Sequence, residues 1–121
     1  MDENVILQDI KKLIGPSEIY DEFDKDLVIH INSVFSILYQ LGVGPKGGFV
    51  ITQDGEETWE DYFDGLDNTN LYQMVKSYIY LKVRMIFDPP TGSVSSSYKE
   101  QIDEYEWRLS VTPDTNWEKE E

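Results

Sequence analysis

The sequence LYQMVKSYIYLKVRMIF occupies residues 71–87, and it decides the fold because apolar side chains cover most of the predicted helix. A narrow polar stripe along this helix contains Gln73, Lys76, Ser77 and Arg84. A helix that is apolar on most of its faces has to be buried on most of them. It ends at Asp88, because the residue before Pro89 is pushed out of helical geometry. The segment therefore predicts a central helix against which the rest of the chain packs.

Three further helices are predicted on either side of this segment. The clearest runs over residues 25–41, where one helical face carries Leu27, Ile31, Val34, Phe35, Leu38 and Leu41. A shorter helix covers residues 3–14 and ends at Gly15-Pro16, which is a typical helix stop. The last helix begins at a cap, Ser93 or Ser95, and continues to about residue 110. Its apolar side chains recur at helical spacing and are Tyr98, Ile102, Tyr105 and Leu109.

Residues 42–58 interrupt the helical pattern with a glycine-rich stretch. Within it, residues 49–52 are rich in β-forming side chains and predict a short strand. Such a strand needs a partner, in a small hairpin or in another chain, because its backbone groups have to be paired. Thr58 and Asp61 then cap a single helical turn. The predicted fold is a mostly α bundle of about four helices plus this short turn, with one small β-hairpin or strand in an extended loop.

With 121 residues the chain has the size of one domain. We divide it into a single helical domain, residues 1–111, from which the loop 42–58 protrudes, and an acidic C-terminal tail, residues 112–121. The 24 acidic and 10 basic residues give a net charge of −14, which disfavours binding to nucleic-acid phosphates and to anionic membrane surfaces. No apolar run is long enough to span a membrane and the N-terminus is acidic, so we expect a soluble intracellular product.

No group of residues predicts catalysis, a cofactor or a metal site. The chain has no cysteine, and its single histidine, His30, has one carboxylate among its helical neighbours and is interpreted as a boundary or surface residue. Lys46 precedes the last two glycines of the loop, which is the wrong spacing for a phosphate-binding loop. The acidic run between Asp54 and Asp67 does not match a Ca²⁺-binding loop. The chain is therefore expected not to be an enzyme and to need no cofactor.

The three tryptophans differ in their surroundings. Trp59 and Trp107 have apolar neighbours at helical spacing, so both are expected to be at least partly buried. Trp117 lies in a polar tail, where it either anchors a partner or folds back on its own domain. The sequence leaves both roles of Trp117 open.

Four stretches form a pattern that covers nearly the whole chain. They are DIKKLIG at residues 9–15, INSV at 31–34 with LYQLGVG at 38–44, ETWEDY at 57–62, and VKSYIYLKVR at 75–84 with FDPP at 87–90. The last stretch is followed by Tyr98, Gln101, Ile102, Glu104, Glu106, Trp107, Arg108 and Leu109. In this pattern the chain resembles the small head–tail connector proteins, also called adaptor or head-completion proteins, of long-tailed double-stranded DNA bacteriophages.

The resemblance implies a mostly helical structural protein of the virion, located in the neck between head and tail. It implies a homo-oligomeric ring, expected to be a dodecamer, that joins the portal protein to a stopper or tail-completion protein. DNA would pass through the lumen without specific binding, and no catalytic residue, cofactor or membrane is involved. We assign the contacts to other subunits or partners to the loop and the tail, at Val43, Gly44, Pro45, Lys46, Phe49, Val50, Ile51 and Trp117.

A second interpretation of the acidic charge stays open. A soluble regulator, for instance a DNA mimic or an inhibitor, would use acids on one face to bind a basic partner protein. The glycine-rich loop and the tail, which can reach neighbouring subunits, favour the connector.

Overall fold

The computed structural model describes residues 5–14, 23–45, 47–52, 55–63, 69–87 and 90–111. These residues form five helices, which are α1 (Ile6–Ile14), α2 (Asp24–Gln40), α3 (Trp59–Phe63), α4 (Thr69–Phe87) and α5 (Gly92–Ser110). The prediction of a mostly α fold is confirmed, and the predicted helix ends lie within a few residues of the observed ones.

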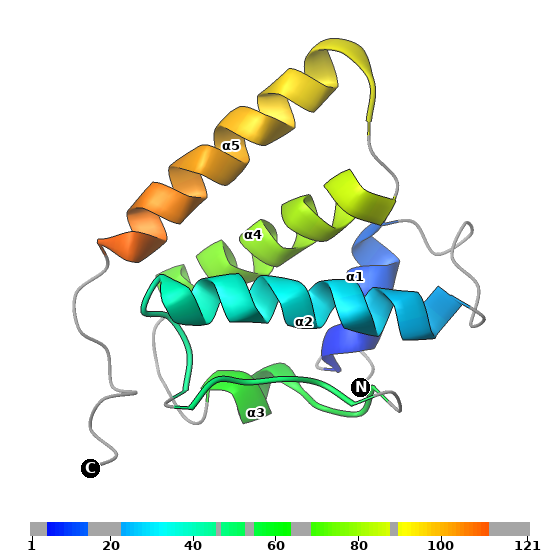
Figure 1. Cartoon of the computed structure of the whole chain (residues 1–121), viewed down its shortest axis with the longest axis vertical. Coiled ribbons are helices and arrows are strands. Elements are labelled where there is room, and N and C mark those ends of the chain that lie inside the picture. The colour runs from blue at the N-terminus through cyan, green and yellow to red at the C-terminus, as the bar shows by residue number, and fades with distance from the viewer. Residues whose placement is uncertain are drawn as a thin grey trace.

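Helix α4 is the centre of the arrangement, as its apolar sequence predicts. It packs against α1, α2 and α5, and Figure 1 shows α5 on the opposite side of α4 from the short helix α3. Val75, Tyr78, Ile79 and Val83 of α4 have no exposed surface at all. Each of the three aliphatic side chains among them stabilises the fold by about 1.5–3 kcal/mol relative to leaving it in water.

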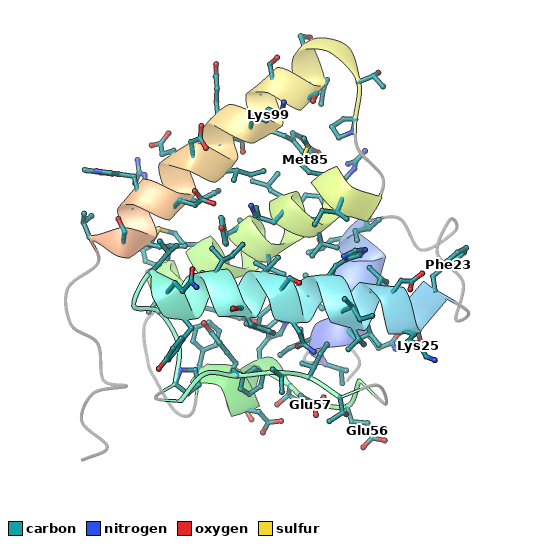
Figure 2. The ribbon with its side chains drawn as sticks, in the orientation of Figure 1. Phe23, Lys25, Glu56, Glu57, Met85 and Lys99 are labelled. Carbon is teal, nitrogen blue, oxygen red and sulfur yellow. The ribbon has the colours of Figure 1, made fainter. Side chains whose placement is uncertain are left out.

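Helix α5 is an outer layer rather than part of the core. Ile102 and Leu109 are the buried residues among its nineteen, and Tyr98 and Tyr105 are partly buried against the core. Most of its other side chains are exposed. Met85 of α4 lies between the two helices, as the labelled side chain in Figure 2 shows. One long face of α5 is therefore open to solvent.

The predicted β-hairpin or strand over residues 49–52 is not found, because the described residues contain no strand. Instead, the backbone of Ile51 pairs with a side chain. Asn32 Nδ2 donates to the Ile51 carbonyl at 2.9 Å, and the Ile51 N–H donates to Asn32 Oδ1 at 2.8 Å. This amide pair satisfies the two groups that a neighbouring strand would otherwise have to satisfy. β-Type pairing occurs elsewhere, at an isolated antiparallel bridge between Val5 and Thr58.

Replacing Asn32 with alanine is expected to lower the free energy of unfolding by about 1–2 kcal/mol, because two partly buried backbone groups lose their partners. Ser33→Ala, at the exposed neighbouring position on α2, is the matched control and should change stability by less than about 0.5 kcal/mol. Urea denaturation followed by tryptophan fluorescence measures both. Equal unfolding midpoints for the two variants would contradict the role given to Asn32.

Candidate functional site

The loop that leaves α2 is the first candidate site, and its path depends on a close approach to α3. Val43 follows the end of α2, and its N–H donates to the Leu38 carbonyl at 2.9 Å. Gly44 then takes a φ of +119°, and a Cβ at this position would lie only 3.0 Å from the Tyr62 hydroxyl oxygen. Glycine is required here both for the left-handed backbone and for the space.

Three aromatic rings hold the next part of the loop against the body. The ring of Phe49 lies 5.2 Å from the ring of Phe35 on α2 and 5.2 Å from that of Tyr62 on α3, with both pairs edge to face. Phe35 and Tyr62 are themselves 4.9 Å apart. Such pairs contribute about 0.5–1.5 kcal/mol beyond the area that they bury. The loop is therefore fixed to α2 and α3 by apolar packing as well as by Asn32.

The loop residues that we assign to subunit or partner contacts fall into a buried group and an exposed group. Val43 and Ile51 are each 3% exposed, and Phe49 is half-buried, so their side chains pack within the chain's own core. Gly44 and Pro45 are partly exposed, and Val50 is 64% exposed. Lys46 and Trp117 lie outside the described residues. Among the described loop residues, Val50 is thus the one that offers a large apolar side chain to a partner.

A second group of side chains ties α1, α3 and α4 together around one carboxylate. Asp9 Oδ2 accepts a hydrogen bond from Trp59 Nε1 at 2.9 Å and lies 2.9 Å from Lys76 Nζ. The Lys76 ammonium also lies 5.1 Å from the centre of the Tyr72 ring. Burial by itself lowers the pKa of Lys76, but the hydrogen bond and charge of Asp9, together with the smaller effect of Tyr72, outweigh it and raise that pKa. The burial expected for Trp59 is confirmed at 2% exposed.

Polar contacts fasten α5 to α4. Tyr78 Oη donates to Glu106 Oε2 at 2.7 Å, and Lys82 Nζ lies 3.8 Å from the same oxygen. Further along, Arg84 Nη1 donates to the hydroxyl of Tyr98 at 3.1 Å. Burial, together with the hydrogen bond to Glu106 and its charge, raises the pKa of Tyr78 well above the usual value. The Tyr78–Glu106 hydrogen bond between α4 and α5 therefore requires an uncharged phenol.

The stability of the protein is expected to fall as the pH rises above about 10, because the folded state holds the protons of Tyr78 and Lys76 more tightly than the unfolded state does. The extra stability is complete below the usual pKa values of 10.0 for tyrosine and 10.5 for lysine, and it is lost as the pH approaches the higher values of the folded state. Tyr78→Phe should flatten this decline, while Tyr39→Phe, at an exposed position on α2, should not. Thermal unfolding between pH 8 and pH 11 tests this, and identical slopes for the two variants would count against it.

The outer face of α5 is a candidate surface that the sequence reasoning missed. Trp107 is 66% exposed, so the expectation that it is partly buried is wrong. At about 100° per residue, Trp107 lies roughly 140° around the helix from the buried Ile102, on the side turned away from α4. The apolar residues near it in the sequence, Ile102 and Leu109, lie on the opposite face of the helix and are buried. The angle around the helix axis between Trp107 and the residues Ile102 and Leu109 is the sequence signal that predicts an exposed Trp107.

The described residues offer neither a metal site nor a membrane span. They contain no group of three or more histidine, aspartate or glutamate side chains arranged to hold an ion. In the same part of the chain, no helix is both long enough and apolar enough to cross a membrane.

Comparison with known proteins identifies the family. The sequence model described as phage connector protein matches residues 6–116, a range that includes all five helices. No curated protein and no solved structure is significantly similar to the chain. The resemblance to head–tail connectors is thereby confirmed, and the chain belongs to the phage connector protein family.

Proposed function

We propose that the protein is a subunit of a ring, a dodecamer by expectation, that joins the portal at the head vertex to the stopper or tail-completion protein. The observation that carries the proposal is the match to the phage connector family over residues 6–116. Membership of this family indicates a structural role at the junction of head and tail rather than a catalytic one. The ring, its two partners and the passage of DNA through its lumen are the finer parts of the proposal.

The charge of the chain supports the passage of DNA. With a net charge of −14, the subunits would repel a phosphate backbone rather than bind it. This repulsion acts over about 8–10 Å at physiological salt, which is enough to reduce adhesion to a lumen wall. An acidic channel therefore lets the duplex slide.

The described loop supports a role in assembly, because it is both anchored and exposed. Asn32 and Phe49 fix its inner side, and Val50 faces solvent. A loop held in one shape loses less conformational freedom when a partner binds it. We propose Val50, Gly44 and Pro45 as direct contacts, Val43, Phe49 and Ile51 as the residues that hold the loop in shape, and Lys46 and Trp117 as further contacts.

Electron microscopy of lysates tests the proposed function. A phage in which this gene is inactivated is expected to release separate DNA-filled heads and finished but unattached tails. Supplying the intact chain from a plasmid should restore tailed particles, which is the control. Normally tailed particles in the absence of the chain would overturn the proposal and favour an acidic regulator that binds a basic partner.

A further inference from the structure

We propose that α5 is a strap over α4 that opens as one unit, with its hinge at Gly92, while helices α1 to α4 stay folded. Such an opening is a property of the chain itself, so it goes beyond the proposed function and does not depend on the ring or its partners. An element that opens alone can take a new position without unfolding the rest of the chain. Elements that move in proteins are drawn from the least stable parts of the fold.

The apolar contact that holds α5 is small for the length of the helix. Its nineteen residues bury two apolar side chains, Ile102 and Leu109, and Tyr98 and Tyr105 add partly buried rings. The nine residues of α1 bury four apolar side chains, and the seventeen residues of α2 bury six. Burial of apolar surface is the main force that holds a helix in place. Of these three helices, α5 is therefore the most weakly held.

Helix α4 is the element that holds α5. Among the described elements, α5 makes an extensive contact with α4 alone, whereas α1, α2 and α4 all contact one another. Figure 1 shows α5 as the outlying helix of the arrangement. Opening α5 therefore breaks one interface between helices and leaves the interfaces among α1, α2 and α4 in place.

The side of α4 beneath α5 differs from the side that carries its main apolar row. Met74, Tyr78 and Lys82 recur every four residues and meet α5, at a cleft or through polar contacts. Tyr78 is the buried residue of these three. The apolar row lies one position further along the chain, about 100° around the helix axis, and consists of the fully buried Val75, Ile79 and Val83. Opening α5 thus leaves this row in the core.

The other contacts between α4 and α5 are polar or leave space. Glu106 Oε2 accepts from Tyr78 Oη at 2.7 Å and lies 3.8 Å from Lys82 Nζ, and the two charged side chains are partly exposed. Water can replace the partner of an exposed charge, so such pairs add little stability. A cleft of about 320 Å³ also lies between the helices, lined by Met74, Gln101, Glu104, Tyr105 and Arg108. Side chains beside an open space lose the contacts that a closed core would give them.

Gly92 gives the strap its hinge. It is the first residue of α5 and has a φ of +64°, and no other described part of the protein lies within 4 Å of the position that a Cβ would take. Hinges are a few residues, often at the end of an element, that absorb a change of backbone angles. Glycine has the widest range of such angles. The start of α5 therefore has both the space and the freedom to turn.

Hydrogen exchange of the purified chain, followed by mass spectrometry under native conditions, tests the opening. Amides over residues 98–109 of α5 are expected to share one protection factor that is at least tenfold below that of α2. Ile31→Val removes one carbon from the buried face of α2 and should lower the protection of α2 by about two- to tenfold. It should leave the protection of α5 unchanged, because the contacts of Ile31 persist when α5 opens.

Ile102→Val is the matched control, because it removes the same group from α5. It should lower the protection of α5 and of α2 by the same factor, since its contacts are lost both when α5 opens and when the whole chain unfolds. Equal protection of α2 and α5 in the unchanged protein would overturn the inference. A loss in α5 on Ile31→Val as large as the loss in α2 would also overturn it. Neither result alters the outcome expected from the lysates, which test the proposed function separately.

Discussion

Asp9→Leu is expected to lower the free energy of unfolding by about 2–4 kcal/mol. The substitution leaves the Lys76 ammonium and the Trp59 N–H without the carboxylate that both contact at 2.9 Å. The Asp9 side chain is 8% exposed and that of Lys76 is 24% exposed, so water can replace only part of what is lost. Removing one partner of a buried ion pair costs about 3–5 kcal/mol, and the partial exposure of Lys76 reduces this figure.

Two controls separate the charge from the packing. Lys76→Met in the Asp9→Leu background is expected to recover part of the loss, because the unpaired ammonium is gone. Glu104→Gln alters the exposed pair with Arg108, whose side chains are 58% and 56% exposed, and should cost less than about 1 kcal/mol. Urea denaturation measures all of these variants. A loss for Asp9→Leu no larger than that for Glu104→Gln would show that this contact does not hold the three helices together.

Gly55→Ala is expected to lower the free energy of unfolding by about 2–4 kcal/mol. Gly55 has a φ of +62°, where an alanine costs about 1–2 kcal/mol, and its new Cβ would overlap the Leu7 side chain on α1. Leu7 is 1% exposed and cannot move aside without disturbing the core. Crowding a packed core in this way adds about 1–3 kcal/mol.

Gly92→Ala is a matched control, because Gly92 has nearly the same φ of +64° with nothing near its missing side chain. This variant is expected to show the backbone cost alone, so the difference between the two measures the contact with Leu7. The double variant Leu7→Ala/Gly55→Ala should cost less than the sum of its single changes, since the smaller residue leaves room. Equal losses for Gly55→Ala and Gly92→Ala in thermal or urea unfolding would refute the close packing of this loop on α1.

Hydrophobic spacing was sufficient to predict the helices. Helices α2 and α4 were clear because their apolar residues recur over four or more turns and their ends carry glycine or proline signals. Hydrophobic periodicity does not show which element pairs with the backbone N–H and carbonyl groups of a short extended segment. Residues 49–52 have the composition of a strand, but the partner of Ile51 is the side chain of Asn32, nineteen residues earlier on a helix. A pairing of that kind leaves no pattern in the local sequence.

The candidate site was less predictable than the fold. Apolar residues in a glycine-rich loop serve either the chain's own core or a partner, and their sequence is the same in both cases. The structure shows that Val43 and Ile51 serve the core and that Val50 does not. The exposure of Trp107 has a related reason, because the apolar residues at helical spacing near it, Ile102 and Leu109, lie on the opposite face of α5. The contacts assigned to Lys46 and Trp117 stay predictions.

Cryo-electron microscopy of the neck in intact particles tests the central claim most directly. We predict a closed ring of copies of this chain between the portal and the stopper, in which each copy shows the five described helices and DNA occupies the lumen. A neck without density for these helices, in particles from which mass spectrometry also fails to detect the chain, would contradict the claim that the protein is a structural connector.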